Sequence, residues 1–387
     1  MKNIVILGST GSIGSKSIDV ILRNSNNFKL YAISSYNKIN LLAKQAYCLN
    51  VRIIILPNYE SYKYFLSIWK GSYFLPEIRI GSNSLSETVS DIECDIVISA
   101  ITGISSLPSI LSAISSGKKV LIANKEVLVT AGSLIMNLAK KNNSDLIPID
   151  SEHNAILQCL NYANNSEIKK ITLTASGGPF LNCGKDFLQK VKPKDAFLHP
   201  NWEMGKKISV DSATLFNKGI EVIEAFWLFS IPVEKIEVTI HPQSILHSMV
   251  SYKDGSIIAQ LGHPDIRMSI SYGLNCPGRM NSGVNILKIS EIECISFKYP
   301  NFKLFPCLKL SFEALYLGQG ACIVINAVNE IAVNAFLEGK LNFNSIHKKI
   351  DDSLNWYTKQ SNSEVNSISD IFYLDLYARN WAKDMIY

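Results

Sequence analysis

The sequence predicts an α/β protein in which an N-terminal doubly wound parallel sheet is followed by a central α+β domain and a C-terminal helical bundle. Strand-like and helix-like segments alternate in the first part, which is typical of a parallel sheet between two layers of helices. In the central part a long helix-like segment precedes several strand-like ones, and the last part is helical. We place the domains at residues 1–149, 150–275 and 301–387, with a linker at 276–300 that contains Pro and Gly.

Each expected strand is a short apolar run, and each expected helix carries apolar residues at helical spacing. In the first domain, strands are expected at 3–7, 29–34, 52–56, 95–99, 119–123 and 146–149, and helices up to residue 22 and at 41–49, 107–115 and 127–140. In the central domain, strands are expected at 168–174, 235–240, 246–251 and 256–260, which would form a mostly antiparallel sheet, with one long helix at 211–228. The C-terminal helices are expected at 312–317, 321–337, 346–357 and 371–385.

Composition restricts the class of protein. Of 387 residues, 47% are hydrophobic and 18% charged, which indicates a globular rather than a disordered chain. The net charge of +5 comes from scattered basic residues, so we expect no nucleic-acid partner. The eight cysteines form no C-x-x-C pair, the first apolar run is too short for a signal peptide, and no window reaches the length of a membrane span. We therefore expect a cytoplasmic protein with reduced thiols and no membrane partner.

A glycine-rich turn follows the first expected strand and opens the first expected helix. It contains Gly8, Gly11 and Gly14, one residue more widely spaced than the usual dinucleotide fingerprint. Glycines let the backbone turn sharply and approach a pyrophosphate, which then lies at a helix N-terminus. An ordinary glycine-rich turn is the alternative, but the flanking strand and helix favour a Rossmann-like dinucleotide site.

The second expected strand indicates which dinucleotide binds. Sites for NAD usually carry an acidic residue at the end of this strand, where it holds the ribose 2′-hydroxyl. Here no Asp or Glu occurs between Asp19 and Glu60, and Lys38 stands where a cation could meet a 2′-phosphate. This pattern favours NADPH, with a solvated surface lysine as the alternative explanation of Lys38.

Two carboxylates follow the last strand of the first domain. If Asp150 and Glu152 belong to an extended segment, their side chains point to the same side, because residues two apart in a strand share a face. Like charges this close are costly unless a cation lies between them, and oxygen ligands suit Mg²⁺ or Mn²⁺. An acidic helix start is the competing explanation.

The long helix supplies a polar face of a related kind. Asn217, Lys218 and Glu221 lie at i, i+1 and i+4, so that Glu221 could be a third metal carboxylate and the other two could donate to a phosphate. Ser212 lies near the start of this helix, and Ser176 ends a strand in a Ser-Gly-Gly turn. A solvated polar face is the alternative.

Two further segments carry candidate residues. Residues 124–126 follow a strand at the carboxyl edge of the sheet, where ligands of such folds bind. His199 and Trp202 lie in a polar loop before Gly205, and an exposed Trp in such a loop often closes over a ligand. The alternative is a Trp that anchors the loop into the core. His241 and His247 stand in or beside strands and are expected to be structural.

Together these motifs resemble the family of 1-deoxy-D-xylulose 5-phosphate reductoisomerases. The segments that carry the resemblance are GSTGSIG (8–14), LIANKEVLV (121–129), IPIDSEHNAI (147–156), TASGGPF (174–180), HPNWEMGKKISVDSATLFNKGIEVIEA (199–225) and HPQSILHSM (241–249). The resemblance implies a cytoplasmic, homodimeric, NADP-dependent oxidoreductase of the non-mevalonate isoprenoid pathway. It would convert 1-deoxy-D-xylulose 5-phosphate to 2-C-methyl-D-erythritol 4-phosphate with a divalent metal.

The resemblance also implies roles for individual residues. The metal, Mg²⁺, Mn²⁺ or Co²⁺, would be held by Asp150, Glu152 and Glu221, which with Lys125 form the catalytic set. Substrate contacts would come from Lys125, Ser151, Glu152, Ser176, His199, Trp202, Ser212, Asn217, Lys218 and Glu221. Contacts to NADPH would come from Thr10, Gly11, Ser12, Ile13, Asn37, Lys38, Asn124, Glu126 and Gly205.

The chain departs from the family pattern in two places, and two rival functions remain open. The family usually has Gly and Asn where this chain has Tyr36 and Lys38, and Glu203 is an unusual acid beside a phosphate site. One rival is another NADP-dependent oxidoreductase acting on a phosphorylated aldehyde or ketone, but a cysteine-dependent one would need a thiol in a polar motif. The other is a binding protein that has lost its chemistry, which the complete set of candidate ligands disfavours.

Overall fold

The computed structural model describes residues 1–71, 75–160, 165–197, 205–360 and 365–387, which form two compact units. Unit 1 consists of Met1–Val127, Ile135–Asn154 and Asp265–Asn285. Unit 2 consists of Leu128–Leu134, Ala155–Pro264 and Ile286–Tyr387, and so takes in most of the expected central domain and all of the expected C-terminal one. The division into three domains stays a prediction.

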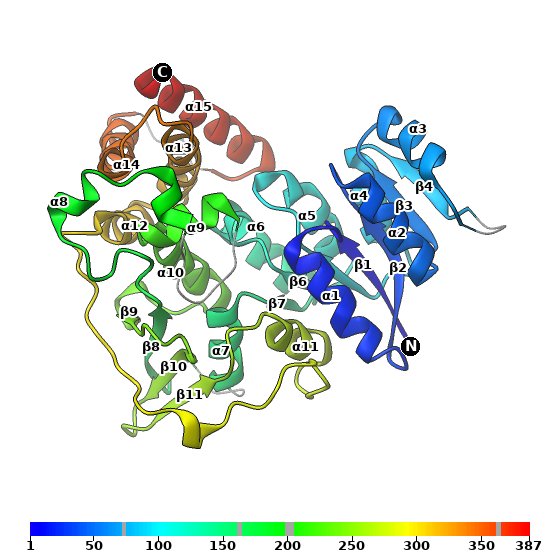
Figure 1. The fold of residues 1–387 in the computed structure, drawn as a ribbon, viewed down its shortest axis with the longest axis horizontal. Coiled ribbons are helices and arrows are strands. Elements are labelled where there is room, and N and C mark those ends of the chain that lie inside the picture. The colour runs from blue at the N-terminus through cyan, green and yellow to red at the C-terminus, as the bar shows by residue number, and fades with distance from the viewer. Residues whose placement is uncertain (72–74, 161–164, 198–204, 361–364) are drawn as a thin grey trace. The chain divides into compact units, whose positions relative to one another are not determined.

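Unit 1 is built on a seven-stranded sheet in which every pair of neighbours is parallel (Figure 1). The strand order is β4-β3-β2-β1-β5-β6-β7, with bounds β1 (Lys2–Leu7), β2 (Phe28–Ser34), β3 (Ile53–Leu56), β4 (Glu77–Ile80), β5 (Ile96–Ser99), β6 (Lys119–Ile122) and β7 (Leu146–Pro148). Each inner strand contains a run of consecutive buried apolar residues, as expected where helices cover both faces of a sheet. The order reverses between β1 and β5, so ligands are expected beyond the carboxyl ends of these strands.

The helices that start in unit 1 connect these strands, with two exceptions. They are α1 (Ser12–Arg23), α2 (Ile39–Leu49), α3 (Tyr59–Ile68), α4 (Ser82–Ser90), α5 (Leu107–Ser115), α6 (Lys125–Asn142), α7 (Ser151–Leu160) and α11 (Arg267–Asn275). The first exception, α7, follows the last strand of the sheet and continues into unit 2. The second, α11, returns from far along the chain and is held by an ion pair of 2.9 Å between Arg267 Nη1 and Asp19 Oδ2. Strand β4 and the helices α3, α4, α7 and α11 were not predicted from the sequence. The reason is visible in β4, whose Glu77 and Arg79 form an ion pair and break the apolar pattern.

Unit 2 contains a four-stranded sheet with the order β11-β10-β8-β9. Its strands are β8 (Ile168–Ala175), β9 (Ile236–Ile240), β10 (Leu246–Tyr252) and β11 (Ile257–Leu261). The pairs of β10 with β8 and β11 are antiparallel, whereas β8 and β9 are parallel. The mostly antiparallel sheet expected from the sequence is therefore confirmed.

Among the described residues, the α-helices that lie wholly in unit 2 are three that follow β8 in the chain and four that form a C-terminal bundle. They are α8 (Lys185–Leu188), α9 (Lys206–Ala213), α10 (Phe216–Phe229), α12 (Pro306–Leu317), α13 (Gln319–Leu337), α14 (Phe343–Thr358) and α15 (Ile368–Ile386). The single helix expected at 211–228 is wrong, since two helices occupy this region. The break is at Leu215, which adopts a left-handed conformation with φ +59°. A helix cannot continue through a residue in that conformation.

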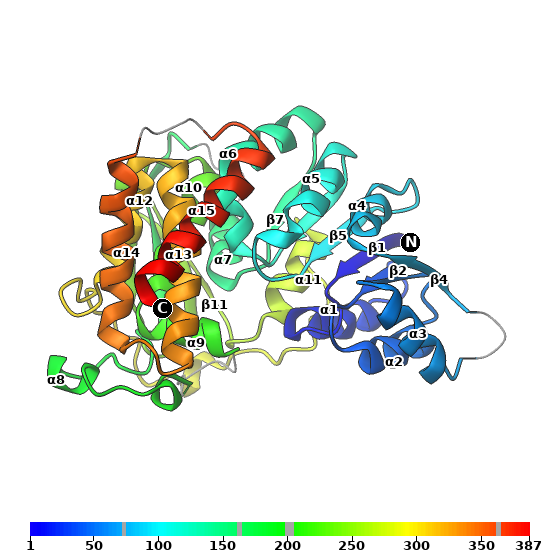
Figure 2. The same ribbon diagram turned by 90° about the horizontal axis from the view of Figure 1, so that it is seen from above.

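Helix α13 is the core of the C-terminal bundle, where α12, α14 and α15 surround it (Figure 2). By length and composition it could cross a membrane, so the expectation that no window reaches this length is wrong. However, 83% of its apolar window is buried inside the protein. The apolar composition of α13 is therefore that of a core helix.

Candidate functional site

The glycine-rich turn joins β1 to α1 at the point where the strand order reverses. Gly8 has φ +86°, and a Cβ on Gly14 would lie 2.3 Å from the Gly8 carbonyl oxygen, so both positions require glycine. The turn is fixed to the neighbouring strand, because the Gly8 N–H donates to Ser34 Oγ at 2.9 Å. Thr10 Oγ1 forms a second link with Ser35 Oγ at 2.7 Å. This is the geometry of a dinucleotide-binding turn, and its serine anchors were not foreseen from the sequence.

The end of β2 lies beside this turn and presents three exposed side chains, Tyr36, Asn37 and Lys38. The backbone N–H of Lys38 donates to Ser35 Oγ at 3.3 Å, which ties the cationic residue to the same serine that contacts Thr10. Unit 1 thus brings the glycine turn close to Lys38, the residue that the sequence predicts to contact the 2′-phosphate. The contacts of these residues to a cofactor stay predictions.

Residues 124–126 begin α6, as a segment at the carboxyl edge of the sheet should. The Asn124 side chain accepts from the Glu126 N–H at 3.1 Å and donates to the carbonyls of Ile101 and Gly103 at 2.7 and 2.6 Å. Asn124 is therefore a helix cap that also holds the loop after β5. No sequence pattern indicates this structural role, and a contact of Asn124 to NADPH stays a prediction.

The two neighbouring carboxylates of unit 1 lie at the start of α7 rather than in an extended segment. Asp150 precedes the helix and Glu152 occupies its first turn, so the expectation of a shared strand face is wrong. Acidic residues favour such a position because the helix N-terminus is electropositive. The oxygens of Asp150 and Glu152 nevertheless lie within 4.8 Å of each other. Ser151 Oγ donates to Glu152 Oε2.

A cation already faces this carboxylate pair. Lys125 Nζ lies 2.6 Å from Asp150 Oδ2, and His153 Nδ1 lies 3.8 Å from the same oxygen. The side chains of Lys125 and Asp150 are each only 15% exposed. Unit 1 thus combines four predicted residues, Lys125, Asp150, Ser151 and Glu152, in one partly buried polar cluster. Oxygen donors this close together fit a hard divalent cation.

The polar face of α10 in unit 2 is deeply buried. Glu221 is 1% and Lys218 4% exposed, and Lys218 Nζ forms an ion pair with Glu221 Oε2. Asn217 Nδ2 donates to the other oxygen, Glu221 Oε1, at 2.5 Å. A solvated helix face, the alternative weighed from the sequence, is therefore wrong. Burying these charges is costly, so the arrangement persists because each charge has a partner.

The turn after β8 touches the end of α9, which brings two predicted phosphate residues together. Gly178 has φ +68°, and a Cβ on it would lie 2.7 Å from the Ser212 carbonyl oxygen. The Gly178 N–H donates to Ser176 Oγ at 3.2 Å. Ser176 and Ser212 are thus placed by one tight contact that only glycine allows.

Replacing Gly178 by Ala is expected to lower the free energy of unfolding by about 1–3 kcal/mol, because the new Cβ meets backbone in a left-handed conformation. Chemical denaturation of the purified chain measures this change. Gly184→Ala is the matched control, since a Cβ there has no atom within 4 Å and φ is −84°. Equal stability of the two variants would contradict the steric role of Gly178.

The histidines of the central sheet have structural roles, as expected. His241 Nε2 accepts from the Leu246 N–H at 3.2 Å, and His247 Nε2 lies 3.3 Å from the His263 carbonyl oxygen. Burial lowers the pKa of His247 to about 4, against the raising effect of its backbone contacts, and the charges of Lys218 and His241 lower it further. His247 is thus neutral at physiological pH.

This shift predicts a pH dependence of stability. The folded state keeps His247 neutral, so its contribution is complete above the ordinary pKa near 6.5 and is lost as the pH falls toward 4. Between pH 7.5 and 5.0 the loss is expected to be about 2 kcal/mol. Urea unfolding of the parent chain and of His247→Gln at both pH values measures it. Between the two pH values, the free energy of unfolding of the variant should fall by about 2 kcal/mol less than that of the parent. Equal decreases would contradict the lowered pKa of His247.

Two predicted residues, His199 and Trp202, lie outside the described residues. Gly205, the next predicted position, is the N-cap of α9, where its carbonyl accepts from the Ser209 N–H at 3.0 Å. Its expected contact with NADPH stays a prediction.

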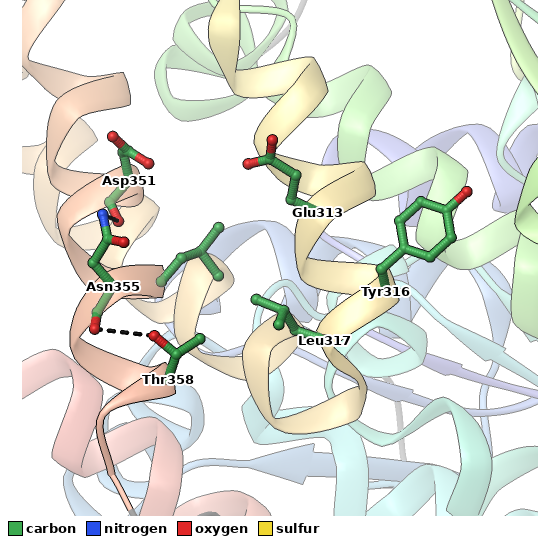
Figure 3. Close-up of a pocket in the computed structure, with 7 residues that line it drawn as sticks. Glu313, Tyr316, Leu317, Asp351, Asn355 and Thr358 are labelled. Carbon is green, nitrogen blue, oxygen red and sulfur yellow. Dashed lines mark hydrogen bonds between the residues drawn. The ribbon is translucent and has the colours of Figure 1, made fainter.

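A separate pocket of about 350 Å³ lies between α12 and α14 of unit 2 (Figure 3). It is lined by Glu313, Tyr316, Leu317, Asp351, Leu354, Asn355 and Thr358. None of these is a predicted site residue, and Thr358 Oγ1 donates to the Asn355 carbonyl within α14 rather than into the space. The pocket is therefore distinct from the polar clusters described above.

These features first define a class. A doubly wound parallel sheet with its glycine turn at the reversal of strand order belongs to the dinucleotide-binding α/β proteins. Comparisons with known proteins then identify the family. The chain belongs to the 1-deoxy-D-xylulose 5-phosphate reductoisomerase family, because the family model of that description matches residues 4–132 and models of its C-terminal domains match 146–229 and 261–381.

Individual relatives agree with this membership over the full length. The 1-deoxy-D-xylulose 5-phosphate reductoisomerase of Bordetella avium is 46% identical over 392 residues, covering 99% of this chain and 98% of the relative. That of Thermoanaerobacter pseudethanolicus is 44% identical, covering 96% of each chain.

Solved structures agree as well. A DOX-P reductoisomerase in complex with NADPH, fosmidomycin and magnesium has a TM-score of 0.93 at 39% identity, covering 100% of this chain and 98% of the other. The Zymomonas mobilis enzyme in complex with NADPH has a TM-score of 0.92 at 38% identity, covering 100% and 99%. The predicted fold class is therefore confirmed.

Proposed function

We propose that this chain is an NADPH- and divalent-metal-dependent enzyme that rearranges and reduces 1-deoxy-D-xylulose 5-phosphate to 2-C-methyl-D-erythritol 4-phosphate in the non-mevalonate isoprenoid pathway. The observation that carries the proposal is the combination, within unit 1, of a glycine turn at the strand reversal with the Lys125–Asp150–Glu152 cluster. Family membership supports the same activity, because relatives that match over the full length are named 1-deoxy-D-xylulose 5-phosphate reductoisomerase.

The proposed cofactor is NADPH, bound at the turn between β1 and α1. Its pyrophosphate would accept hydrogen bonds from the backbone N–H groups of residues 10–13 at the N-terminus of α1. The 2′-phosphate would bind to Lys38 and Asn37, whose side chains are exposed beside the turn. No acidic residue occurs at positions 20–59 of the sequence to repel it. Glu126, Asn124 and Gly205 are proposed as further contacts by the family resemblance alone.

The proposed metal ligands are Asp150 and Glu152 of unit 1 and Glu221 of unit 2. The donor set fits a hard cation, since all three offer carboxylate oxygens and the first two lie within 4.8 Å of each other. When bound, Mg²⁺ or Mn²⁺, or alternatively Co²⁺, supplies a Lewis acid for the ketone and hydroxyl oxygens of the substrate. Lys125 would pair with Asp150 and donate to a substrate oxygen, and Ser151 would orient Glu152.

The proposed site for the substrate's phosphate is in unit 2. Ser176 and Ser212 lie on either side of the Gly178 contact, and Lys218 supplies a buried ammonium. Asn217 adds an amide donor on the same helix. His199 and Trp202 are proposed as additional contacts on the resemblance. Phosphate binding far from the reacting carbons orients the substrate, which is a major source of rate enhancement.

The direct test is the oxidation of NADPH, followed by absorbance, after addition of 1-deoxy-D-xylulose 5-phosphate and Mg²⁺. We expect turnover that stops when a chelator is added and returns with metal, and slower turnover with NADH. Product analysis should give the branched polyol phosphate. Turnover of other phosphorylated aldehydes or ketones with no reaction of this substrate would favour the rival oxidoreductase, and cofactor binding without any turnover would favour a binding protein.

We further propose that the enzyme is a cytoplasmic homodimer that uses the edge strand β11. This strand pairs only with β10 among the described strands, whereas the other edge, β9, is joined by a bridge from Ile240 to Lys298. Ile257 and Ile258 of β11 are 60% and 47% exposed. An exposed apolar edge strand normally pairs or is covered, because its backbone groups and side chains otherwise promote aggregation.

The variant Ile258→Lys is expected to convert the dimer to a monomer by placing a charge in this interface. Sedimentation equilibrium of the parent chain should give twice the mass of a single chain, and the variant should give the single mass at the same concentration. The matched control is Ile92→Lys in unit 1, where Ile92 is 93% exposed and lies outside any strand. A dimer that survives Ile258→Lys unchanged would remove β11 from the interface.

A further inference from the structure

Helix α9 is short and has little of its own to fix its orientation. It has only eight residues, begins after Gly205 in an extended conformation and ends before the left-handed Leu215. Yet it carries Ser212, which the proposed function assigns to the substrate's phosphate. Something outside α9 must therefore hold its rotation and position.

That support is a buried hydrogen bond to Asp211, the residue directly before Ser212. Asp211 is 1% exposed, and its Oδ1 accepts from Asn329 Nδ2 of α13 at 2.8 Å. Lys207 Nζ, one turn earlier on α9, lies 3.3 Å from Asp211 Oδ2. Because Asp211 and Ser212 are adjacent on one helix, any rotation that moves the first also moves the second.

The polar contacts continue beyond α13 to the last helix of the chain. Lys207 Nζ lies 3.8 Å from Glu330 Oε1, and Arg379 Nη2 of α15 lies 2.7 Å from Glu330 Oε2. Arg379 also donates to Asp375 through Nε and Nη2, at 2.6 and 3.1 Å. Burial opposes the charge of Arg379, but these two acidic partners raise its pKa above the ordinary value.

The charges alternate along this path, which we call the α9–α15 polar chain. Its members are Asp211, Asn329, Lys207, Glu330, Arg379 and Asp375. It differs from the surface pairs of the protein, because Asp211, Asn329 and Asp375 are at most 5% exposed. Buried, connected polar groups tolerate few alternative arrangements, so they fix the relative position of the helices that carry them.

We propose that the α9–α15 polar chain positions Ser212 for the substrate's phosphate, so that residues of the C-terminal helix control substrate affinity without touching the substrate. This inference rests on the proposed function, which places the phosphate at Ser212. Arg379 and Asn329 are positioning residues in this scheme, and the chemical step does not involve them.

The test is the kinetics of Arg379→Gln and Asn329→Leu in the full-length enzyme. Each is expected to raise the KM for 1-deoxy-D-xylulose 5-phosphate by about tenfold, which corresponds to the coupling typical of connected polar groups. The kcat and the KM for NADPH should stay within about twofold of the parent values. Arg379→Lys, which keeps the charge, should restore part of the affinity.

Two controls separate positioning from general support. Lys340→Gln removes an exposed ion pair with Glu338 in the same unit and should change none of these constants. The double variant Glu330→Gln, Arg379→Gln should raise KM no more than the larger single change, because Glu330 is the residue that connects Arg379 to Lys207. An unchanged KM in folded Arg379→Gln, or a uniform loss of kcat and of both affinities together with stability, would overturn the proposal.

A second measurement does not depend on turnover. Inorganic phosphate, titrated into the full chain and followed by calorimetry, should bind Arg379→Gln about tenfold more weakly than the parent. Equal phosphate affinity would also overturn the proposal. A Ser212→Ala variant reveals whether the parent chain binds phosphate through Ser212. If it does, but the parent does not consume the expected substrate, only the proposed reaction is wrong. The phosphate titration then still tests the role of the polar chain.

Discussion

Glu221→Gln is expected to lower kcat by about a thousandfold, equivalent to about 4 kcal/mol of transition-state stabilisation. The change removes a proposed metal ligand's charge and leaves the ammonium of Lys218 without its counter-charge in a buried position. Binding of NADPH should survive, because the dinucleotide turn lies in unit 1. Steady-state kinetics at saturating metal, with fluorescence titration of NADPH, measure both quantities.

The control for this variant is Glu313→Gln, the same substitution in an exposed Lys–Glu pair on α12. It should leave kcat unchanged. Unaltered turnover of Glu221→Gln at saturating Mg²⁺ would refute the role of Glu221 as a ligand. A loss of NADPH affinity equal to the loss of kcat would instead indicate a misfolded protein.

Lys218→Ala is expected to raise the KM for the substrate by about a hundredfold, since truncating one member of a buried charged pair typically costs about 2–5 kcal/mol. The ammonium is the proposed donor to the phosphate, so the main effect should be on substrate binding. Steady-state kinetics give KM and kcat separately. Lys309→Ala, which breaks the exposed pair with Glu313, is the control. An unaltered KM would exclude Lys218 from the phosphate site.

Local patterns explain most of what the sequence predicts correctly. The glycine turn is contiguous, and its steric demand at Gly8 and Gly14 follows from the strand and helix on either side. Lys218 and Glu221 lie one helical turn apart, so the polar face that they share needs only the helix. The strands β1, β2, β5 and β6 each contain at least three consecutive buried apolar residues, which a parallel sheet covered on both faces requires.

The errors arise where long-range packing or a single backbone angle decides the structure. No pattern marks the left-handed Leu215 that divides α9 from α10, and an acidic helix start at Asp150 resembles the end of a strand. Helix α11 joins unit 1 through an ion pair that spans 248 positions in sequence. The hydrogen bond between Asn329 and Asp211 spans 118 positions, so the sequence predicts Ser212 as a site residue but not the contact that supports its helix.

The buried pair of Lys218 and Glu221 has a thermodynamic consequence for ligand uptake. In the proposed site, a cation at the carboxylate of Glu221 would compete with the ammonium of Lys218, and an anion at that ammonium would compete with the carboxylate. Each ligand would therefore release the group that the other one needs. Linkage requires that metal strengthen the binding of phosphate by the same factor by which phosphate strengthens the binding of metal. In the proposed enzyme, the pair would make substrate and metal cooperative ligands, so that neither saturates the site well alone.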